Sequence, residues 1–273
     1  MTAVLAELFG VAKPVIAMLH LPALPGRPRH DAPAGLPLII DTVARDLAVL
    51  QEAGVDGLLF CNEGDLPYQL GVGPEAVAAM AAVIGAVRRE ISRPFGVNLV
   101  WDPVASLAVA RATGARFVRE VFTGVYESDL GIMQPDFGAI SAYRAGIGAR
   151  DVALLANITP EFASSAGRRS IAERAASAAF LGVDALLISG AITGEPTDLA
   201  QLRAAKAAAP GTPVLANTGV RAQTVAGVLA VADGVIVGTG LKEGGRTWNP
   251  VDPARAAQFM TAARRAVQSA VSA

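Results

Sequence analysis

The sequence holds a single cysteine, Cys61, so an internal disulfide and a cysteine-based metal cluster are both excluded. Its mean hydropathy is +0.44, yet no apolar run reaches the roughly 20 residues that a membrane-spanning helix needs. The 23 basic and 24 acidic residues nearly cancel, which leaves no broad attraction for nucleic acid or anionic lipid. We therefore expect small molecules as partners, and neither nucleic acid nor a membrane.

Lysine is scarce, with three residues in the chain. Lys13 precedes the first expected strand and Lys206 lies in an expected helix, so neither reaches a strand end. Lys242 follows the last strand, where it fits better as an anion contact or a surface residue than as a Schiff-base nucleophile. A lysine-dependent aldolase is therefore disfavoured.

A targeting signal and a cofactor-binding motif are also missing from the sequence. Residues 1–15 have no basic segment followed by a long apolar core and cleavage site, so we expect no signal peptide and a cytoplasmic location. No Gly-x-Gly-x-x-Gly follows the first strand, which disfavours dinucleotide binding. We predict no cofactor, apart from the metal ion considered below.

What the chain does have is an eightfold rhythm. Eight apolar runs each end in a small polar or glycine-bearing cluster, and an Ala-rich segment of helical period follows each. The runs cover residues 14–20, 55–62, 94–101, 116–122, 151–157, 183–189, 213–217 and 233–238. Strands without polar alternation are buried on both faces, as in a parallel sheet covered by helices. Eight such units predict an α/β fold, a single (β/α)8 TIM barrel that spans residues 1–273.

Helices are expected between the strands, including segments 40–53, 74–90, 170–181 and 198–209. No Pro/Ser/Gly linker or charge run separates two cores, so one domain is favoured. Because active sites of these barrels lie at the carboxyl ends of the strands, the residues that close each run are the candidates for chemistry.

Glycine-bearing loops follow the last two strands. Gly219 lies in one, and Gly238, Thr239 and Gly240 form the other. In many barrels these two loops surround a phosphate with backbone N–H groups, which glycine allows to approach the anion closely. We predict a phosphate site here, and the alternative is that the glycines only form tight turns.

Four side chains near the ends of the first four strands are candidates for proton chemistry: His20, Glu63, Asp102 and Glu120. A carboxylate at the barrel mouth acts as a general acid or base when burial moves its pKa toward the working pH. The alternatives are that His20 pins the adjacent Pro-rich loop and that Asp102 only caps a helix. Arg119 and Glu120 are neighbours on one strand, so one of the two should face inward.

Other polar residues at strand ends are expected to bind the substrate. They are Asn98, Arg119, Asn157, Ser189 and Asn217. The acids could also hold Mg²⁺ or Mn²⁺, which prefer oxygen ligands. No closely spaced ligand motif singles out a metal site, so we assign no metal ligands.

Two long loops are expected on the catalytic face, residues 21–28 and 123–137. We predict that one covers the mouth or reaches a neighbouring subunit's mouth in a homo-oligomer. The alternative is that segment 123–137 packs over the barrel edge.

Several motifs resemble those of the BtpA/SgcQ family. They are Leu19-His20-Leu21-Pro22-Ala23-Leu24-Pro25-Gly26, Gly54-Val55-Asp56-Gly57, Phe122-Thr123-Gly124-Val125-Tyr126, Gly238-Thr239-Gly240-Leu241-Lys242 and Trp248-Asn249-Pro250-Val251-Asp252. The resemblance covers about residues 14–255 and implies a TIM barrel of the ribulose-phosphate-binding kind. One branch of the family is linked to photosystem I biogenesis, and the other is encoded among sugar-uptake and sugar-metabolism genes.

The chain resembles the sugar-operon branch more than the photosystem branch. The latter has Arg-Asn-Asp after the third strand and a histidine at the end of the fifth, where this chain has Trp101-Asp102 and Asn157. We therefore expect a cytosolic enzyme that acts on a phosphorylated sugar or sugar-like metabolite by acid–base chemistry, as an isomerase, epimerase, lyase or hydrolase. The alternative is a non-enzymatic assembly or stability factor of the photosystem I biogenesis type.

Overall fold

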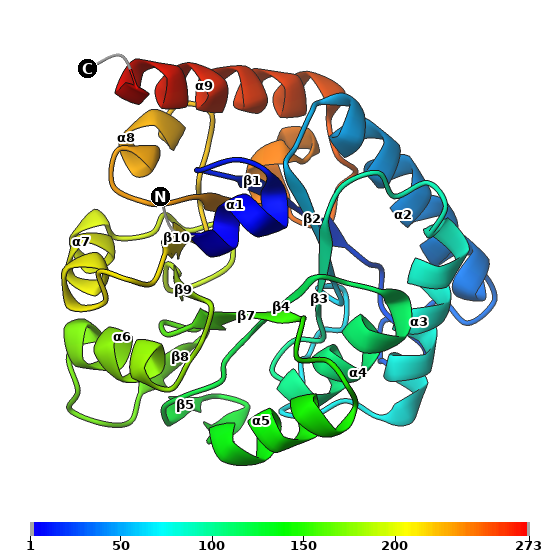
Figure 1. The fold of residues 1–273 in the computed structure, drawn as a ribbon. Helices are drawn as coiled ribbons and strands as arrows, with labels where there is room; N and C mark the ends of the chain where they lie inside the picture. The colour runs from blue at the N-terminus through cyan, green and yellow to red at the C-terminus, as the bar shows by residue number, and fades with distance from the viewer. Residues whose placement is uncertain (1–2, 272–273) are drawn as a thin grey trace.

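The computed structural model describes residues 3–271 and has a closed barrel of eight parallel strands at its centre (Figure 1). Neighbours around the barrel follow the order β1-β11-β10-β9-β7-β4-β3-β2. The strands are β1 (Val15–His20), β2 (Gly57–Cys61), β3 (Phe95–Asn98), β4 (Phe117–Glu120), β7 (Ala153–Asn157), β9 (Ala185–Ile188), β10 (Val214–Ala216) and β11 (Val235–Val237). Each lies within one of the eight predicted runs, so the predicted TIM barrel is confirmed.

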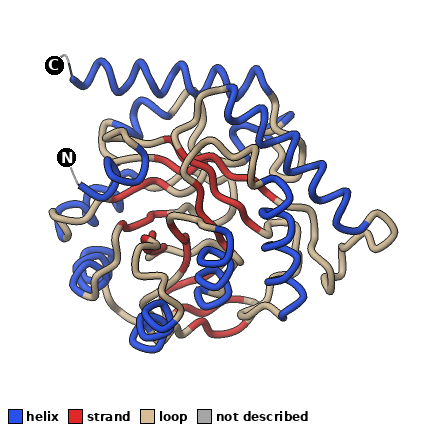
Figure 2. The backbone as a smooth tube through the Cα atoms, turned by 45° about the vertical axis from the view of Figure 1, so that its right-hand side comes forward, coloured by secondary structure: helices blue, strands red, loops and turns tan. Residues whose placement is uncertain are grey.

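Helices form the outer layer around the strands (Figure 2). They are α2 (Gly35–Glu52), α3 (Pro74–Val87), α4 (Pro103–Thr113), α5 (Phe137–Gly146), α6 (Ile171–Phe180), α7 (Leu199–Ala208), α8 (Val225–Leu229) and α9 (Pro253–Val271). Helix α2 begins five residues before the predicted position 40. Pro37 lies in the first turn of α2, where proline is tolerated because no helical partner needs its N–H. No helix among the residues that the structure describes is long and apolar enough to cross a membrane.

The barrel interior and the helix layer have separate cores. Alternate strand residues such as Ile16, Leu59 and Leu155 fill the interior. Helix α1 (Ala3–Phe9) lies across one opening of the barrel (Figure 1), where the Phe9 ring packs edge-on against Phe117 at 5.4 Å between centroids. Because α1 contributes to the interior core at the amino ends of the strands, a site can open only at their carboxyl ends.

A small antiparallel sheet lies outside the barrel, in the order β6-β5-β8. Strands β5 (Tyr126–Ser128) and β6 (Gly131–Met133) form a hairpin within the predicted excursion 123–137, and β8 (Ala163–Ser165) comes from the loop after β7. Tyr126 and Met133 pack against Trp101, but no residue of the excursion lines the central cavity. Within one chain the excursion therefore packs over the barrel edge and does not cover the mouth, and its contact with a second subunit stays a prediction.

Candidate functional site

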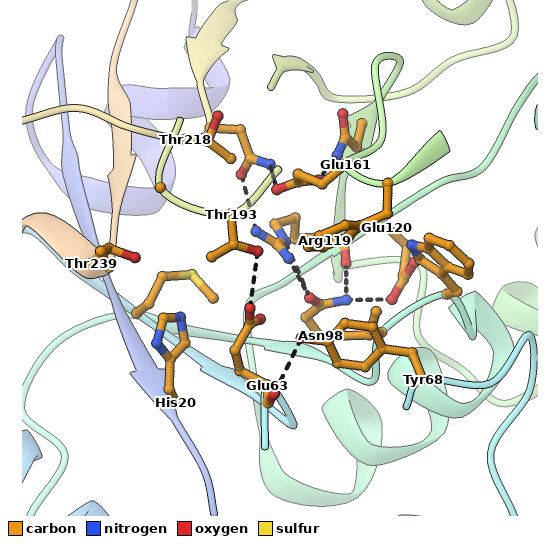
Figure 3. Close-up of a pocket in the computed structure, with 18 of the residues that line it drawn as sticks. His20, Glu63, Tyr68, Asn98, Arg119, Glu120, Glu161, Thr193, Thr218 and Thr239 are labelled. Atoms are coloured by element: carbon orange, nitrogen blue, oxygen red, sulfur yellow. Dashed lines mark hydrogen bonds between the residues drawn. The ribbon is translucent and has the colours of Figure 1, made fainter. Parts of the chain in front are cut away.

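Strand alternation brings the predicted polar residues together at the barrel mouth. The inward-facing row that contains Met18, Leu59 and Phe117 lower in the barrel ends in polar side chains at its top. The predicted residues that line this central cavity are His20, Glu63, Asn98, Arg119, Glu120, Asn157, Asn217, Gly219, Gly238 and Thr239 (Figure 3). Residues from seven strand ends or the loops after them therefore converge on one site.

Arg119 is the cation at the centre of this site (Figure 3). Its Nε and Nη2 donate to Oδ1 of Asn98 at 3.1 and 2.7 Å, and its Nη1 donates to Oδ1 of Asn217 at 3.3 Å. Burial alone would lower the pKa of Arg119, but nearby acids, Glu161 above all, raise it above its ordinary value. A fixed guanidinium thus faces the space where a substrate would lie.

Glu120 is a buried carboxyl at the wall of the cavity. Arg119 belongs to the inward-facing row of β4, as expected for one of these two neighbours. Glu120 is the last residue of β4, and it also lines the cavity. Its carboxyl accepts hydrogen bonds from the side-chain amide of Asn98 and from the backbone N–H of Val121. Burial raises the pKa of Glu120 to about 8, although Arg119 opposes this shift. At neutral pH this side chain therefore carries a proton.

Glu63 faces Glu120 across the cavity and is also buried (Figure 3). The hydroxyl of Thr193 donates to Oε1 of Glu63 at 3.1 Å, and the Cys61 thiol donates to Oε2 at 3.6 Å. The hydroxyl of Tyr68 donates to the main-chain carbonyl of Glu63 at 3.2 Å. These contacts fix the carboxylate at the mouth with its two oxygens facing different sides of the site.

Glu161 is a site residue that the sequence analysis missed. The amides of Asn157 and Asn217 donate to its two carboxylate oxygens at 2.9 and 3.3 Å, and burial raises its pKa despite the nearby Arg119. The fifth run ends at Asn157, and Glu161 lies four residues beyond it, after Pro160. Glu161 could have been found from the sequence by the same pattern that identified Glu63, an acidic residue in the loop after a strand.

His20 lies in the cavity wall as a neutral imidazole. Burial and the positive charge of Lys242 lower its pKa to about 3, so the ring cannot serve as a cationic acid near neutral pH. Its Nδ1 lies 3.3 Å from the carbonyl oxygen of Thr247, in the loop after β11. The Pro-rich loop that His20 was suggested to pin is held instead by Asp65, whose Oδ1 accepts from the N–H of Leu24 at 2.7 Å.

Two of the predicted catalytic and substrate-binding residues lie outside the central cavity. Asp102 caps α4 by accepting from the N–H of Ala105 at 2.8 Å, and it also accepts from Val72 at 3.0 Å. Both carboxylate oxygens are used in this way, so the helix-capping alternative describes Asp102 and the catalytic assignment is wrong. Ser189 lies behind the cavity wall, where it accepts from Asn217 at 2.8 Å, and it supports that amide without facing the substrate space.

The predicted phosphate loops line a second cavity of about 320 Å³. Gly219, Thr239 and Gly240 contribute to it, together with Arg221 and Arg255. Gly219 has φ +65°, and a Cβ there would lie 2.1 Å from the carbonyl oxygen of Glu195, so only glycine fits. The cavity shares Gly194, Gly219 and Thr239 with the central one, so the two cavities adjoin.

Gly238 and Lys242 do not belong to this second cavity. Gly238 continues the inward row of β11 and lines the central cavity beside His20, so its assignment to the phosphate loop is corrected. Lys242 is only 2% exposed, and its Nζ forms an ion pair with Oδ2 of Asp46 at 2.8 Å. It is therefore a buried structural residue and neither an anion contact nor a surface residue. Within residues 3–271, no group of three or more His, Cys, Asp or Glu side chains is arranged to hold a metal ion.

Two solved structures illustrate the likeness of this fold to known ones. A structure described as native KDPGal has a TM-score of 0.58 at 16% identity and covers 96% of this chain and 98% of its own. The N-(5′-phosphoribosyl)anthranilate isomerase of Pyrococcus furiosus has a TM-score of 0.54 at 13% identity, with 93% and 99% covered. At these identities the likeness concerns the fold alone.

Sequence relatives cover nearly the whole chain. The putative sgc region protein SgcQ of Escherichia coli is 48% identical, over 94% of this chain and 96% of its own. The photosystem I biogenesis protein BtpA of Synechocystis is more distant, at 30% identity over 97% and 93%. The family model described as the BtpA family matches residues 11–265. The chain therefore belongs to the BtpA family, and within it is more similar to SgcQ than to the photosystem I biogenesis protein.

Proposed function

We propose that this protein is an enzyme that acts on a phosphorylated sugar or sugar-like metabolite by acid–base chemistry. One observation carries the proposal. A cavity with convergent carboxyl groups adjoins a glycine-lined cavity to which two arginines contribute, and the two share Gly194, Gly219 and Thr239. A substrate with a phosphate at one end and a reactive carbon at the other matches this pair of cavities.

The two ends of the site suit different parts of the substrate. Backbone groups around Gly219 and Gly240, with Arg221 and Arg255, are the proposed phosphate ligands. Asn98, Asn157 and Asn217 are the proposed partners for sugar hydroxyl groups, because an amide side chain both donates and accepts hydrogen bonds.

Proton transfer is assigned to two carboxyl groups. Glu120 is the proposed general acid, since burial raises its pKa to about 8 and keeps it protonated at neutral pH. Glu63, on the facing loop, is the proposed general base. Arg119 would stabilise negative charge that develops on a substrate oxygen, and neutral His20 would contribute only a hydrogen bond. A pair of this kind serves isomerases, epimerases, lyases and hydrolases that work by acid–base chemistry, and the proposal covers these four classes.

The phosphate end of the proposal can be tested by calorimetry. D-ribose 5-phosphate and inorganic phosphate should bind, whereas D-ribose should bind much more weakly. Arg221→Ala should weaken both phosphate-bearing ligands by about two- to fivefold, the range for an exposed charge contact. Arg203→Ala, on the outer helix α7, is the matched control and should change neither affinity.

An assembly factor, the second candidate, would behave differently. It would bind none of these ligands, and a panel of sugar phosphates followed by NMR would show no turnover. Homo-oligomer formation and a cytoplasmic location stay predictions, and light scattering of the purified protein tests the first of them.

A further inference from the structure

Two aromatic residues in the central cavity have a strained backbone. Trp101 has φ +67° and Phe162 has φ +61°, and they are the only non-glycine residues with positive φ among residues 3–271. Both line the central cavity, although they come from loops after different strands, β3 and β7. Such conformations cost free energy in L residues, and they concentrate at ligand sites.

The strain at Trp101 has a local explanation, because its backbone N–H points to the carboxyl group of Glu120. Phe162 has no such contact with a catalytic candidate, since its N–H donates to the carbonyl of Ala191 at 2.8 Å. Nor is its ring part of the core, because Phe162 is 43% exposed. What its conformation does is place an aromatic ring at the cavity, opposite Tyr68.

The rings of Tyr68 and Phe162 meet with their centroids 6.2 Å apart and their planes tilted by 46°. A flat ring stacked between two others needs about 7 to 8 Å, twice the carbon–carbon contact distance. The separation of the two ring centroids is thus about 1 Å smaller than the separation needed to hold a flat group between the rings. Tyr68 is the fixed side of the pair, since it is buried and its hydroxyl donates to the main-chain carbonyl of Glu63, whereas solvent lies on the outer side of the 43% exposed Phe162.

The two rings come from other strand ends than the proposed phosphate loops. In the barrel order β1-β11-β10-β9-β7-β4-β3-β2, the phosphate loops follow β10 and β11. Tyr68 and Trp101 follow β2 and β3, across the ring from them, and Phe162 follows β7, which β9 separates from β10. Figure 3 shows the same separation, with Thr218 and Thr239 on one side of Arg119 and Tyr68 on the other.

We propose that Tyr68 and Phe162 form a clamp for a flat ring at the end of the substrate remote from its phosphate. The inference rests on the proposed function and narrows its substrate class: a phosphorylated sugar that carries an aryl or heteroaryl group. The central cavity holds about 50 Å³ with the rings in contact, so the flat group enters by parting Phe162 from Tyr68.

A matched pair of probes isolates the clamp. Phenyl β-D-glucopyranoside 6-phosphate and methyl β-D-glucopyranoside 6-phosphate differ only in the ring, and calorimetry measures both affinities. The phenyl compound should bind about tenfold more tightly, as expected for a stacked aromatic pair plus the apolar area it buries. Phe162→Leu should reduce this preference to less than about twofold while leaving the affinity for the methyl compound and for inorganic phosphate unchanged.

Two further variants separate binding from folding. Phe180→Leu makes the same substitution at a 90% exposed phenylalanine on α6 and should keep the full phenyl preference. Phe162→Gly removes the ring and also relieves the positive φ, so it should lose the preference while the melting temperature rises by about 2 °C.

The outcomes distinguish the clamp from the proposed function. If the wild type binds both compounds equally, or if Phe162→Leu keeps the preference, the clamp is wrong while a sugar-phosphate site stands. If neither compound binds and inorganic phosphate does not bind either, the proposed function fails and the clamp fails with it. If only inorganic phosphate binds, the phosphate loops stand and the aryl-sugar assignment is overturned.

Discussion

The hydroxyl of Thr193 donates a hydrogen bond to Oε1 of Glu63 at 3.1 Å, across the mouth of the barrel and between residues 130 positions apart in the chain. Thr193 lies in the loop after β9 and Glu63 in the loop after β2, on different sides of the cavity. The contact orients the proposed base before a substrate is present. It also joins two loops at the carboxyl ends of the barrel strands.

Glu63→Gln should leave this contact in place, because the amide oxygen still accepts from Thr193, but it removes the group that takes up a proton. Turnover of a sugar phosphate identified from the panel should fall by about 10²- to 10⁴-fold, with ligand affinity changed by less than about threefold. Thr193→Val, which removes only the orienting hydroxyl, should have a smaller effect on turnover. Wild-type turnover in Glu63→Gln would rule out Glu63 as the base.

The raised pKa of Glu120 predicts a pH-dependent stability. The folded protein holds this proton up to about pH 8, whereas an unfolded glutamate loses it near pH 4.3. Between these values the folded state binds more protons, so the free energy of unfolding falls as pH rises, by at most about 1.4 kcal/mol per pH unit. Glu120→Gln removes this dependence.

Melting temperatures at pH 6 and pH 9 measure the effect. The wild type should lose more stability between them than Glu120→Gln does, and Glu127→Gln, an exposed residue of β5, should match the wild type. Equal losses in wild type and Glu120→Gln would mean that Glu120 is ionised at neutral pH.

Much of the site follows from strand alternation alone. The eight runs placed His20, Asn98, Arg119, Asn157 and Asn217 at or near strand ends, where chemistry was expected, and the structure places all of them at the cavity, on the inward-facing rows of their strands. The glycine-bearing loops could also be identified from the sequence, because they follow the last two strands of the barrel, where phosphate sites are common.

Residues whose roles depend on loop paths or distant contacts could not be assigned in this way. The sequence around Asp102 is compatible with a helix cap and with a substrate contact. Only its hydrogen bonds with Ala105 and Val72 distinguish the two roles. Lys242 follows a catalytic strand end, yet its partner Asp46 lies 196 residues away on α2. Tyr68 and Phe162 are brought together by the paths of two long loops, which no short-range pattern specifies.

Gly238 should not accommodate a side chain without a displacement of its neighbours. A Cβ would lie 2.7 Å from Cε1 of His20 and 3.2 Å from Cβ of Met18. Gly238→Ala should therefore displace the imidazole and lower the melting temperature by several degrees, whereas Gly211→Ala, with open space around its Cβ, should not. In a double-mutant cycle, His20→Ala should recover part of the loss because it removes the ring that the new methyl group meets.

The ion pair between Lys242 and Asp46 should contribute to the stability of the folded state because it is buried, with the two side chains only 2% and 4% exposed. Lys242→Met leaves the buried Asp46 carboxylate with only the half-exposed guanidinium of Arg45, 3.3 Å away, as a cation, so the free energy of unfolding should fall by about 3 kcal/mol, the lower end of the range for a broken buried pair. Adding Asp46→Asn removes that buried charge and should restore most of the loss, because the amide oxygen can still accept from the N–H of Val251. Urea unfolding of the two variants and the wild type measures these differences.

The matched control is Lys206→Met, which breaks the pair of Lys206 with Asp233, where the side chains are 35% and 23% exposed. Solvent screens this pair, so its loss should cost at most about 1 kcal/mol. If Lys242→Met costs no more than Lys206→Met, the buried aspartate has found a proton or another partner, and the pair does not hold the loop after β11 against α2. If the cost is large and Asp46→Asn relieves it, desolvation of an unpaired charge is the cause, because simple loss of a contact would not be reversed by removing the second partner.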